Sequence, residues 1–465
     1  MAKPSSYDVA VVGAGIGGYV AAIRAAQLGK KVALIEKDKI GGTCLNRGCI
    51  PTKTLLATAS LLYKIRRSED FGIHAENVKI DFGKALARKD AVVNRHIEGV
   101  NFLIKKNGIH LIKGEATIPT KNQIHIRKAE GKETIDIENI IIAAGSGEPS
   151  PSYARVDEEK ILTSRGILEL KEAPESLAVI GGSIIGIEFA EIFNALGSKV
   201  WLLETAANVL PALDKDMGRI YQRTLKKKGI EVLLNTEAKS VEVTPSGKVG
   251  IKAVSKGAPL DIETEKALIA DGRRPLSEAL DLEKTGVQVK DGFIVVNEQM
   301  RTSVPNIYAI GDVTGGKMFA HVAAAGGIVA AENIAGLKST LDYKTIPTCM
   351  YCSPEAASVG LSEDEAKAQG RNVAVGKFPL LASGRASSLG EEDGFAKVVC
   401  DGETSEVLGV HLIGPNVAEI IGEAGLAMRL ECTNEELGSL IHAHPTISEA
   451  LMEAAKAVSK KAIQI

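Results

Sequence analysis

One pattern of residues occurs twice in the chain, and the second copy follows the first at a fixed offset of 168 residues, from Gly13 to Gly181. In each copy an apolar run leads into a glycine-rich turn and a helical stretch, and a second apolar run ends at a glutamate, Glu36 or Glu204. A strand, a tight glycine turn, a helix and a parallel strand form the unit that binds dinucleotides. The sequence therefore predicts an α/β protein with two Rossmann-like folds that bind two nucleotides and pass electrons between them.

The glycines of the first turn have distinct expected roles. Gly13 allows the tight turn, Gly15 allows a pyrophosphate to approach the backbone, and Gly18 lets the helix pack on the strand. The helix N-terminus then faces the pyrophosphate, and Glu36 accepts hydrogen bonds from ribose hydroxyls. The alternative for Glu36 is an ordinary surface glutamate at the end of a strand.

The second turn departs from the first at one position. Gly181, Ile185 and Gly186 lie where the pattern requires, but Ser183 stands where the second glycine would be. We expect its side chain to crowd the pyrophosphate and to weaken or displace binding there. The stretch after Glu204 offers no arginine or lysine for a 2′-phosphate, which favours NAD over NADP.

A third feature is the stretch Gly41–Lys53, which holds Cys44 and Cys49 at the start of a helical pattern. In a regular helix, residues five apart are separated by more than the roughly 7 Å between Cα atoms that a disulfide can bridge. A disulfide here must distort the helix start, which Gly48 and Pro51 make easier. We expect a strained, readily reduced bond of the catalytic kind. The alternative is a pair of buried cysteines without a redox role.

The surroundings of the two thiols predict their acidity. A helix N-terminus and the cationic side chains of Arg47 and Lys53 favour thiolates. We therefore expect the pKa values of Cys44 and Cys49 to be lowered.

The totals exclude several classes of protein. A formal net charge of -2 gives no basic bias toward nucleic acid, and the apolar runs are too short to span a bilayer. A strand begins within the first ten residues and leaves no room for a targeting peptide, so we expect a cytoplasmic protein. Cys349 and Cys352 have the spacing of half a zinc site without a second pair, so we expect no metal site and place them, with Cys400 and Cys432, on strands.

Changes in pattern divide the chain into segments. The first nucleotide-binding domain is expected at 1–148 and again at 269–343, with the second inserted at 149–268. Residues 344–465 are expected to form an α+β domain without nucleotide motifs. Its strands are expected at Ala374–Phe378, Phe395–Val399 and Val407–Ile413.

The returning segment of the first domain delivers a carboxylate. The apolar run 306–310 is followed by Gly311 and Asp312, and Met318 lies just before an Ala/Gly-rich helix. We expect Asp312 to accept a hydrogen bond from a ribityl hydroxyl, and the helix N-terminus to stabilise negative charge on a flavin.

Four motifs together carry a resemblance that covers essentially the whole chain. They are the stretch Gly41–Lys53, the two glycine folds, the dipeptide Gly311-Asp312 and the ending His442–Glu449. In this order they resemble the pyridine nucleotide-disulfide oxidoreductases, most closely the members that act on dihydrolipoamide. The resemblance implies FAD in the first fold, NAD in the second, and a homodimer formed through the last domain.

The resemblance also implies an activity and partners. The activity is the oxidation of protein-bound dihydrolipoamide to lipoamide through a redox-active disulfide and FAD, with NAD+ as electron acceptor. The partners are lipoyl domains and the acyltransferase core of a 2-oxoacid dehydrogenase complex, or the lipoyl protein of glycine cleavage. The alternatives are a glutathione or mercuric reductase, whose expected arginines and C-terminal cysteines are absent here, and a flavin redox sensor that does not turn over.

Four residues carry the chemistry by this resemblance. Cys44 exchanges with dihydrolipoamide, and Cys49 contacts the flavin. His444 of the partner subunit acts as the base and is oriented by Glu449. From the residues alone, Glu449 equally fits a capping box at a helix start, and His442 fits a packing role better than that of a second base.

Further positions match nucleotide-binding residues of the family. Lys53 and Glu188 resemble an ion pair beside the isoalloxazine. The other matching positions are Thr43, Ala116, Gly145, Asp312, Met318 and Ala320 on the FAD side, and Glu204, Ala238 and Gly272 on the NAD side.

Overall fold

The structure is a computed structural model that describes residues 6–465. It divides into two compact units. The first unit contains the chain up to Thr54, Gly83–Pro149 and Gly272–Asp342, and the second contains Leu55–Phe82, Ser150–Asp271 and Tyr343–Ile465.

The first unit is built on a seven-stranded sheet. Its strands are β1 (Ser6–Val12), β2 (Val32–Glu36), β3 (His110–Lys113), β4 (Glu115–Thr120), β5 (Gln123–Lys128), β6 (Gly131–Ile142) and β19 (Ile307–Ala309). The order is β3-β2-β1-β6-β5-β4, and β19 also pairs with β6. β1 runs parallel to β2 and β6, and its side chains from Val9 to Val12 are buried on both faces, as expected of a parallel strand covered by helices.

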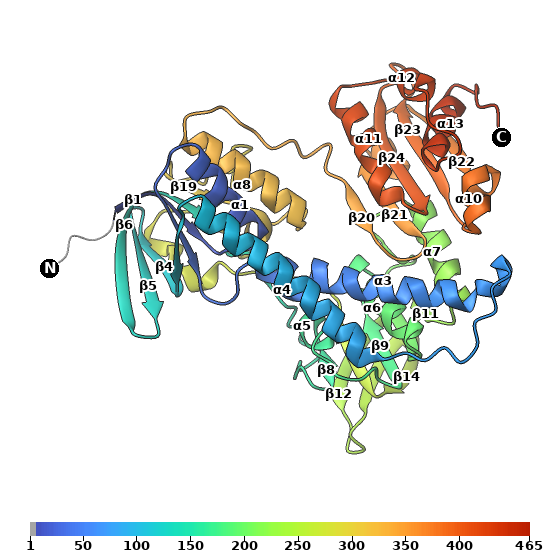
Figure 1. Ribbon diagram of the computed structural model, residues 1–465, viewed down its shortest axis with the longest axis horizontal. Helices are drawn as coiled ribbons and strands as arrows, with labels where there is room; N and C mark the ends of the chain where they lie inside the picture. The colour runs from blue at the N-terminus through green and yellow to red at the C-terminus, as the bar shows by residue number, and fades with distance from the viewer. Residues whose placement is uncertain (1–5) are drawn as a thin grey trace. The chain divides into compact units, whose positions relative to one another are not determined.

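Two helices of the first unit, α1 (Ile16–Gln27) and α8 (Ala320–Ile334), lie side by side (Figure 1). A Cβ on Gly17 would lie 2.9 Å from the carbonyl oxygen of Ala323, and one on Gly327 would lie 2.6 Å from the oxygen of Gly17. Glycine at these positions therefore sets the close approach of the two helices.

The second unit contains a five-stranded parallel sheet and a smaller antiparallel one. The parallel strands are β8 (Ile161–Leu162), β9 (Ser176–Ile180), β10 (Lys199–Glu204), β11 (Glu231–Leu234) and β15 (Lys266–Ile269). Their order is β11-β10-β9-β15-β8, and α6 (Ile184–Ala195) follows β9. The antiparallel sheet consists of β12 (Thr236–Val243), β13 (Val249–Ser255) and β14 (Ala258–Thr264).

The C-terminal part of the second unit is a five-stranded antiparallel sheet with helices. Its strands are β20 (Thr348–Met350), β21 (Glu355–Gly360), β22 (Val373–Pro379), β23 (Phe395–Asp401) and β24 (Val407–Gly414), and its longest helices are α11 (Val417–Arg429) and α13 (Ser448–Val458). The strand order is β20-β21-β24-β23-β22. The predicted fold class, two Rossmann-like folds and a C-terminal α+β domain, is confirmed. The predicted placement of four cysteines on strands is wrong for Cys352 and Cys432, which lie in loops.

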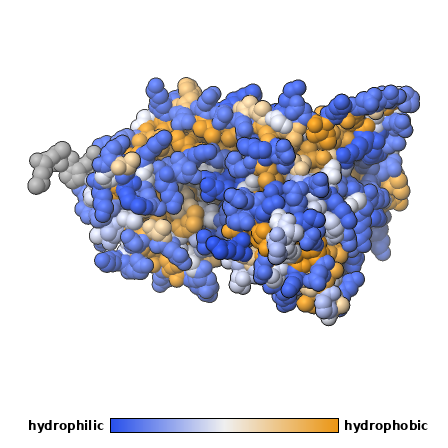
Figure 2. Space-filling view, turned by 90° about the horizontal axis from the view of Figure 1, so that it is seen from below, coloured by the Kyte–Doolittle hydropathy of each residue, from blue (hydrophilic) through white to orange (hydrophobic). Residues whose placement is uncertain are grey.

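The remaining elements connect these sheets. The helices are α2 (Gly42–Arg47), α3 (Cys49–Arg66), α4 (Phe82–Lys106), α5 (Ser164–Ile167), α7 (Lys215–Lys227), α9 (Glu363–Ala368), α10 (Gly384–Leu389) and α12 (Asn434–Ser439). The short strands are β7 (Ser146–Gly147), β16 (Arg274–Pro275), β17 (Val289–Lys290) and β18 (Phe293–Ile294), and the short 3-10 turn η4 covers Gly311–Thr314. Within residues 6–465, no helix combines the length and apolar character needed to cross a bilayer. Figure 2 shows a face on which hydrophilic residues predominate, with apolar patches among them.

Candidate active site

The first glycine turn has no room for side chains at two of its positions. Gly13 has φ +104°, and a Cβ there would lie 2.3 Å from the carbonyl oxygen of Ala143. A Cβ on Gly18 would lie 1.8 Å from the oxygen of Gly13. Around Gly15, by contrast, the nearest atom to such a Cβ is the Cα of Gly42 at 3.9 Å. The backbone of the turn is therefore open to a ligand at Gly15.

Glu36, at the end of β2, holds this turn by its carboxylate. Its Oε2 accepts a hydrogen bond from the backbone N–H of Ala14 at 2.7 Å, and its Oε1 accepts one from Asp38 at 2.8 Å. Each oxygen thus has a fixed donor, and the carboxylate is oriented beside the glycine turn. This is more than the surface role that was the alternative for Glu36.

The second turn repeats this geometry. Gly181 has φ +112°, and a Cβ on Gly186 would lie 2.0 Å from the oxygen of Gly181. Glu204 accepts hydrogen bonds from the backbone N–H groups of Gly182 and Ala206, both at 2.7 Å. The two folds therefore share the same arrangement of turn, helix and carboxylate.

Ser183 makes the second turn different. It is the N-cap residue of α6, and its hydroxyl accepts a hydrogen bond from the backbone N–H of Gly186 at 3.3 Å. The same hydroxyl donates to the carbonyl oxygen of Ala270 at 3.1 Å. The side chain therefore serves as a helix cap. It accepts the hydrogen bond of the Gly186 amide, which would otherwise be free to donate to a bound phosphate.

The donor set of the first fold fits an anionic dinucleotide. The N-cap residue of α1 is Gly15, which makes no side-chain capping bond, so the helix N-terminus keeps its positive character for a phosphate. Helix α8 also begins at an N-cap residue, Phe319, without a side-chain capping bond. Both helix starts and the Asp312 carboxylate lie in one unit, as FAD requires of its binding residues.

The cysteine pair lies where one helix ends and the next begins. Cys44 is in α2, and Cys49 is the first residue of α3. Gly48 separates the helices with φ -144° and ψ -116°, so the helix start is broken between the two cysteines. The thiols are not joined in a disulfide, and the side chain of Cys44 is hydrogen-bonded to Cys49.

The acidity of Cys44 differs from the prediction. Its pKa is raised above the ordinary value, first by the hydrogen bond to Cys49, then by burial and by the nearby charge of Cys49, against which Lys53 acts in the opposite direction. The guanidinium of Arg47, which was expected to favour a thiolate, pairs with Asp38. The predicted lowering of the pKa is therefore wrong for Cys44. The raised pKa favours the protonated form of Cys44.

The redox stretch starts directly beside the first glycine turn. The backbone N–H of Gly41 donates to the carbonyl oxygen of Ala14 at 2.8 Å, and Gly15 and Gly41 form a parallel bridge. A Cβ on Gly42 would lie 2.7 Å from the Cα of Gly15. The two predicted features of the first fold, the phosphate turn and the cysteine pair, thus form one site.

The other predicted positions follow the division into units. The first unit holds both cysteines and the predicted FAD-side residues, namely Gly13, Gly15, Gly18, Glu36, Thr43, Lys53, Ala116, Gly145, Asp312, Met318 and Ala320. The second unit holds the predicted NAD-side residues Gly181, Ser183, Ile185, Gly186, Glu204 and Ala238, whereas Gly272 begins the last segment of the first unit. The second unit also holds Glu188, which was predicted to lie beside the isoalloxazine. The pairing of Lys53 with Glu188 stays a prediction, because the two residues belong to different units.

His444 and Glu449 are in contact in the second unit. Nδ1 of His444 lies 2.9 Å from Oε1 of Glu449, and the imidazole is 78% exposed, so Nε2 is available to a reaction partner. Oε2 of Glu449 accepts a hydrogen bond from the backbone N–H of Thr446 at 2.8 Å. Burial raises the pKa of Glu449, but the bonds from Thr446 and His444 outweigh it and leave the pKa below its ordinary value. One carboxylate therefore serves both the helix start and the histidine.

His442 is held differently. Its imidazole is 6% exposed and lies between the carboxylate of Glu423, at 2.9 Å, and the carbonyl oxygen of Leu440, at 3.0 Å. Both ring nitrogens are engaged, which agrees with the packing role expected for this residue.

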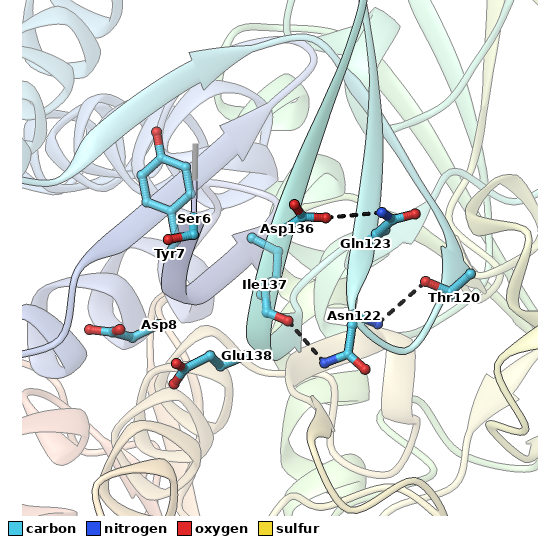
Figure 3. Close-up of a pocket in the computed structure, with 9 residues that line it drawn as sticks. All are labelled: Ser6, Tyr7, Asp8, Thr120, Asn122, Gln123, Asp136, Ile137 and Glu138. Carbon is cyan, nitrogen blue, oxygen red and sulfur yellow. Dashed lines mark hydrogen bonds between the residues drawn. The ribbon is translucent and has the colours of Figure 1, made fainter. Parts of the chain in front are cut away.

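A pocket in the first unit lies away from this chemistry. Figure 3 shows it at the amino end of β1, lined by Ser6, Tyr7 and Asp8 together with residues of β5 and β6. The glycine turn is at the opposite, carboxyl end of β1. Because nucleotides bind at the carboxyl ends of parallel strands, this pocket is not the nucleotide site.

Comparison with known proteins places the chain. A family model described as pyridine nucleotide-disulphide oxidoreductase matches residues 7–327, and the dimerisation domain of the same family matches residues 346–455. The chain belongs to this family. Among its relatives are the dihydrolipoyl dehydrogenase of Bacillus subtilis, 44% identical over 99% of both chains, and the mitochondrial dihydrolipoyl dehydrogenase 1 of Arabidopsis thaliana, 40% identical over 98% of this chain and 91% of that one.

Solved structures of this family have the same fold. LpdA from Mycobacterium tuberculosis is 27% identical with a TM-score of 0.89 and covers 96% of this chain and 98% of its own. The HOCl-induced flavoprotein disulfide reductase RclA from Escherichia coli is 30% identical with a TM-score of 0.85 and covers 97% of this chain and 99% of its own.

The structure adds residues to the site that the sequence did not single out. Ser146 and Arg273 form hydrogen bonds beside Asp312. Ser146 directly follows the predicted Gly145, and Arg273 directly follows the predicted Gly272. Adjacency to these glycines was the available signal, but only the fold brings the two segments together.

Proposed function

We propose that this protein catalyses the dihydrolipoyl dehydrogenase reaction, in which a protein-bound dihydrolipoamide is oxidised to lipoamide and NAD+ is reduced. The observation that carries this proposal is the hydrogen-bonded pair of Cys44 and Cys49 at the break between α2 and α3, directly beside a glycine turn suited to FAD. The similarity to dihydrolipoyl dehydrogenases along nearly the whole chain supports the same reaction. FAD and NAD are the cofactors.

The reaction begins with the pair oxidised to a disulfide. His444 of the partner subunit takes a proton from one substrate thiol through Nε2, and the thiolate attacks the sulfur of Cys44. The Cys44–Cys49 bond breaks, and Cys49 leaves as a thiolate. The second substrate sulfur then attacks the substrate sulfur of the mixed disulfide, which closes the lipoamide ring and releases Cys44. The proton of the second substrate thiol passes to the released Cys44, and His444 keeps the proton of the first.

The reduced pair in the structure corresponds to the end of this exchange. Cys44 is hydrogen-bonded to Cys49, and this bond together with burial raises the pKa of the Cys44 thiol, which favours its protonated form. FAD, which the first glycine turn and Glu36 would hold, would supply the two-electron and hydride chemistry that links the cysteine pair to NAD+. The remaining proton goes to solvent by way of the histidine.

Glu449 fixes the base for this task. Its Oε1 binds Nδ1 of His444, which leaves Nε2 to face the substrate, and its second oxygen is held by the backbone at Thr446. A carboxylate so placed orients the imidazole and stabilises its charged form. We assign Glu449 the role of orienting carboxylate.

Steady-state turnover of dihydrolipoamide with NAD+ tests the proposal. Cys44→Ser should abolish NADH formation while the protein still binds FAD, because the sulfur that exchanges with substrate is gone. The matched control is Cys432→Ser, in a loop outside the site, which should turn over like the parent protein. Turnover by Cys44→Ser at the parent rate would refute the proposal.

The base is tested separately. His444→Gln should lower dithiol turnover by about 10²–10⁴-fold, the usual contribution of a general base, with the dimer intact. His442→Gln is the comparison, since it removes a neighbouring histidine that has no assigned proton transfer. Equal losses in the two variants would remove His444 from the mechanism.

The main rival function is that of another disulfide reductase, and RclA is a structural relative of that description. The relatives at 40–44% identity over nearly the full chain favour the dihydrolipoyl reaction. We propose a homodimer formed through residues 346–455, which match the dimerisation domain, and lipoyl-bearing proteins of 2-oxoacid dehydrogenase or glycine cleavage complexes as partners.

A further inference from the structure

The chain leaves the first nucleotide fold and returns to it through two short strands that pair with each other. β7 runs antiparallel to β16, with Arg274 opposite Gly147 and Pro275 opposite Ser146. The backbone N–H of Leu276 also donates to the carbonyl oxygen of Gly145 at 3.1 Å. Backbone hydrogen bonds therefore join the segment that leaves the fold and the segment that returns to it in one two-stranded ribbon within the first unit.

Arg273 holds this ribbon with its side chain. Its Nε donates to the hydroxyl of Ser146 at 2.7 Å, and its Nη2 donates to the carbonyl oxygen of Ser146 at 2.9 Å. The side chain is 13% exposed, and carboxylate oxygens of Glu148 and Asp312 lie 3.8 Å and 3.7 Å from its nitrogens. The planar fork of an arginine can make both bonds to one residue at once.

Ser146 connects Arg273 to Asp312 through its hydroxyl. Its hydroxyl is hydrogen-bonded to Oδ2 of Asp312, and the serine is 5% exposed. A hydroxyl has a single proton. Because Arg273 donates to the serine oxygen, that proton is directed to the carboxylate.

Asp312 is left with one fixed oxygen and one open oxygen. Oδ2 accepts a hydrogen bond from the hydroxyl of Ser146, whereas Oδ1 accepts none from the residues that the structure describes. The carboxylate stands in η4 directly after β19, at the carboxyl edge of the sheet where nucleotides bind. Fixing Oδ2 sets the direction in which Oδ1 can accept a ligand hydroxyl.

We propose that Arg273 is a positioning residue of the flavin site, which orients Asp312 through the hydroxyl of Ser146. The proposal rests on the proposed placement of Asp312 at the ribityl chain of FAD. Arg273 also ties the carboxylate to the point where the chain returns from the inserted domain.

Titration of the apoprotein with FAD tests this directly. Arg273→Met and Ser146→Ala should each raise the dissociation constant of FAD by about tenfold or more, the size expected for losing a hydrogen bond to a charged group. Arg274→Met is the matched control, because the neighbouring arginine is exposed and its substitution should change the constant by less than about twofold. Arg273→Met with the affinity of the parent protein would overturn the proposal.

A second arm shows whether the arginine acts through the carboxylate. In an Asp312→Ala background, Arg273→Met should cause almost no further rise in the dissociation constant of FAD, since the carboxylate that it orients is gone. If Arg273→Met raises the dissociation constant as much as it does in the parent background, Arg273 does not act through Asp312. If Asp312→Ala itself leaves the FAD affinity unchanged, the placement of Asp312 at the flavin is wrong, which is a different failure.

A third arm separates positioning from a general loss of structure. FAD analogues that lack one ribityl hydroxyl at a time should include one for which Arg273→Met and the parent protein differ by less than about twofold. A purely structural role would leave the same penalty for every analogue. Should Arg273→Met fail to fold, Ser146→Ala removes only the hydroxyl and carries the same test.

Discussion

The two glycine turns are copies in sequence, yet they treat the start of the following helix differently. At the first turn Gly15 leaves the N-terminus of α1 without a side-chain cap, whereas at the second turn Ser183 caps α6 through the amide of Gly186. In both, a glutamate at the end of the second strand accepts one hydrogen bond from a backbone amide of the glycine turn and one from the amide two residues after itself. Both turns are therefore held by a glutamate, but only the first leaves the helix N-terminus without a side-chain cap for a phosphate.

The surroundings of the two folds also differ. The first turn touches the redox stretch through Gly41 and Gly42, which ties it to the cysteine pair. The second fold is tied to the C-terminal sheet by Lys397, whose buried ammonium contacts Asp214 at 2.9 Å and Glu363 at 2.9 Å. A tightly held FAD beside the thiols and an exchangeable NAD in the other fold are what the dehydrogenase reaction needs.

The largest expected effect tests what the copies share. Gly18→Ala and Gly186→Ala should each lower the free energy of unfolding by about 3 kcal/mol or more, because the new Cβ would lie 1.8 Å and 2.0 Å from a carbonyl oxygen. Denaturant unfolding measures the loss. Gly99→Ala, in α4 with no atom within 4 Å of the new Cβ, is the control and should be stabilising by about 0.5–1 kcal/mol. A mild effect at only one of the turns would break the equivalence.

Substitution of each glutamate should weaken the binding of a different nucleotide. Glu36→Gln should weaken FAD binding and Glu204→Gln should weaken NADH binding, each by about 2 kcal/mol, because the side-chain amide keeps only one acceptor oxygen for two backbone donors. Titration of each variant with each nucleotide checks this. Glu204 is 8% exposed and Glu36 is less buried, so the unfolding free energy should fall further in Glu204→Gln. Loss of both nucleotides in either variant would contradict two separate sites.

Acid should affect the second unit through the Lys397 contacts. Hydrogen bonds from Lys367 and Lys397 lower the pKa of Glu363 from 4.5 to about 2. A lowered folded-state pKa stabilises the fold above the unfolded value, and this stabilisation is lost as the pH falls from 4.5 toward 2. Amide hydrogen exchange in α7 and β23 should rise over this range by an amount corresponding to about 1 kcal/mol, and Glu363→Gln should flatten that dependence. The same slope in the variant would rule out Glu363 as the cause.

The smallest effect sharpens the difference at Ser183. Ser183→Gly frees the amide of Gly186 and should raise the affinity for NADH about threefold, while the loss of the cap costs only a few tenths of a kcal/mol. The mirror variant Gly15→Ser should lower the affinity for FAD. Equilibrium titrations measure both. Weaker NADH binding by Ser183→Gly would mean that the hydroxyl helps to bind the nucleotide.

The sequence predicted what depends on local pattern and missed what depends on distant partners. The glycines and the two glutamates follow from a strand, turn and helix that are contiguous, so both folds could be predicted. The hydroxyl of Ser183 turns to Ala270, and Arg273 reaches Ser146, over separations of 87 and 127 residues. No local pattern reports such contacts.

Two predictions on side-chain chemistry show the same limit. The hydrogen bond to Cys49 and burial raise the pKa of Cys44, so the expected lowering did not follow. Arg47 is close to both cysteines in sequence, but its guanidinium pairs with Asp38. For Glu449 the helix cap and the histidine partner were opposed as alternatives, whereas the two oxygens of one carboxylate serve both.

The most direct test of the central claim follows the flavin absorbance of the purified protein through one cycle without turnover. Dihydrolipoamide alone should change the flavin spectrum, and NAD+ added afterwards should restore it, because electrons enter through the cysteine pair and leave through the second fold. In Cys44→Ser, dihydrolipoamide should leave the spectrum unchanged while NADH still reduces the flavin. A Cys44→Ser flavin that responds to dihydrolipoamide at the parent rate would contradict the account.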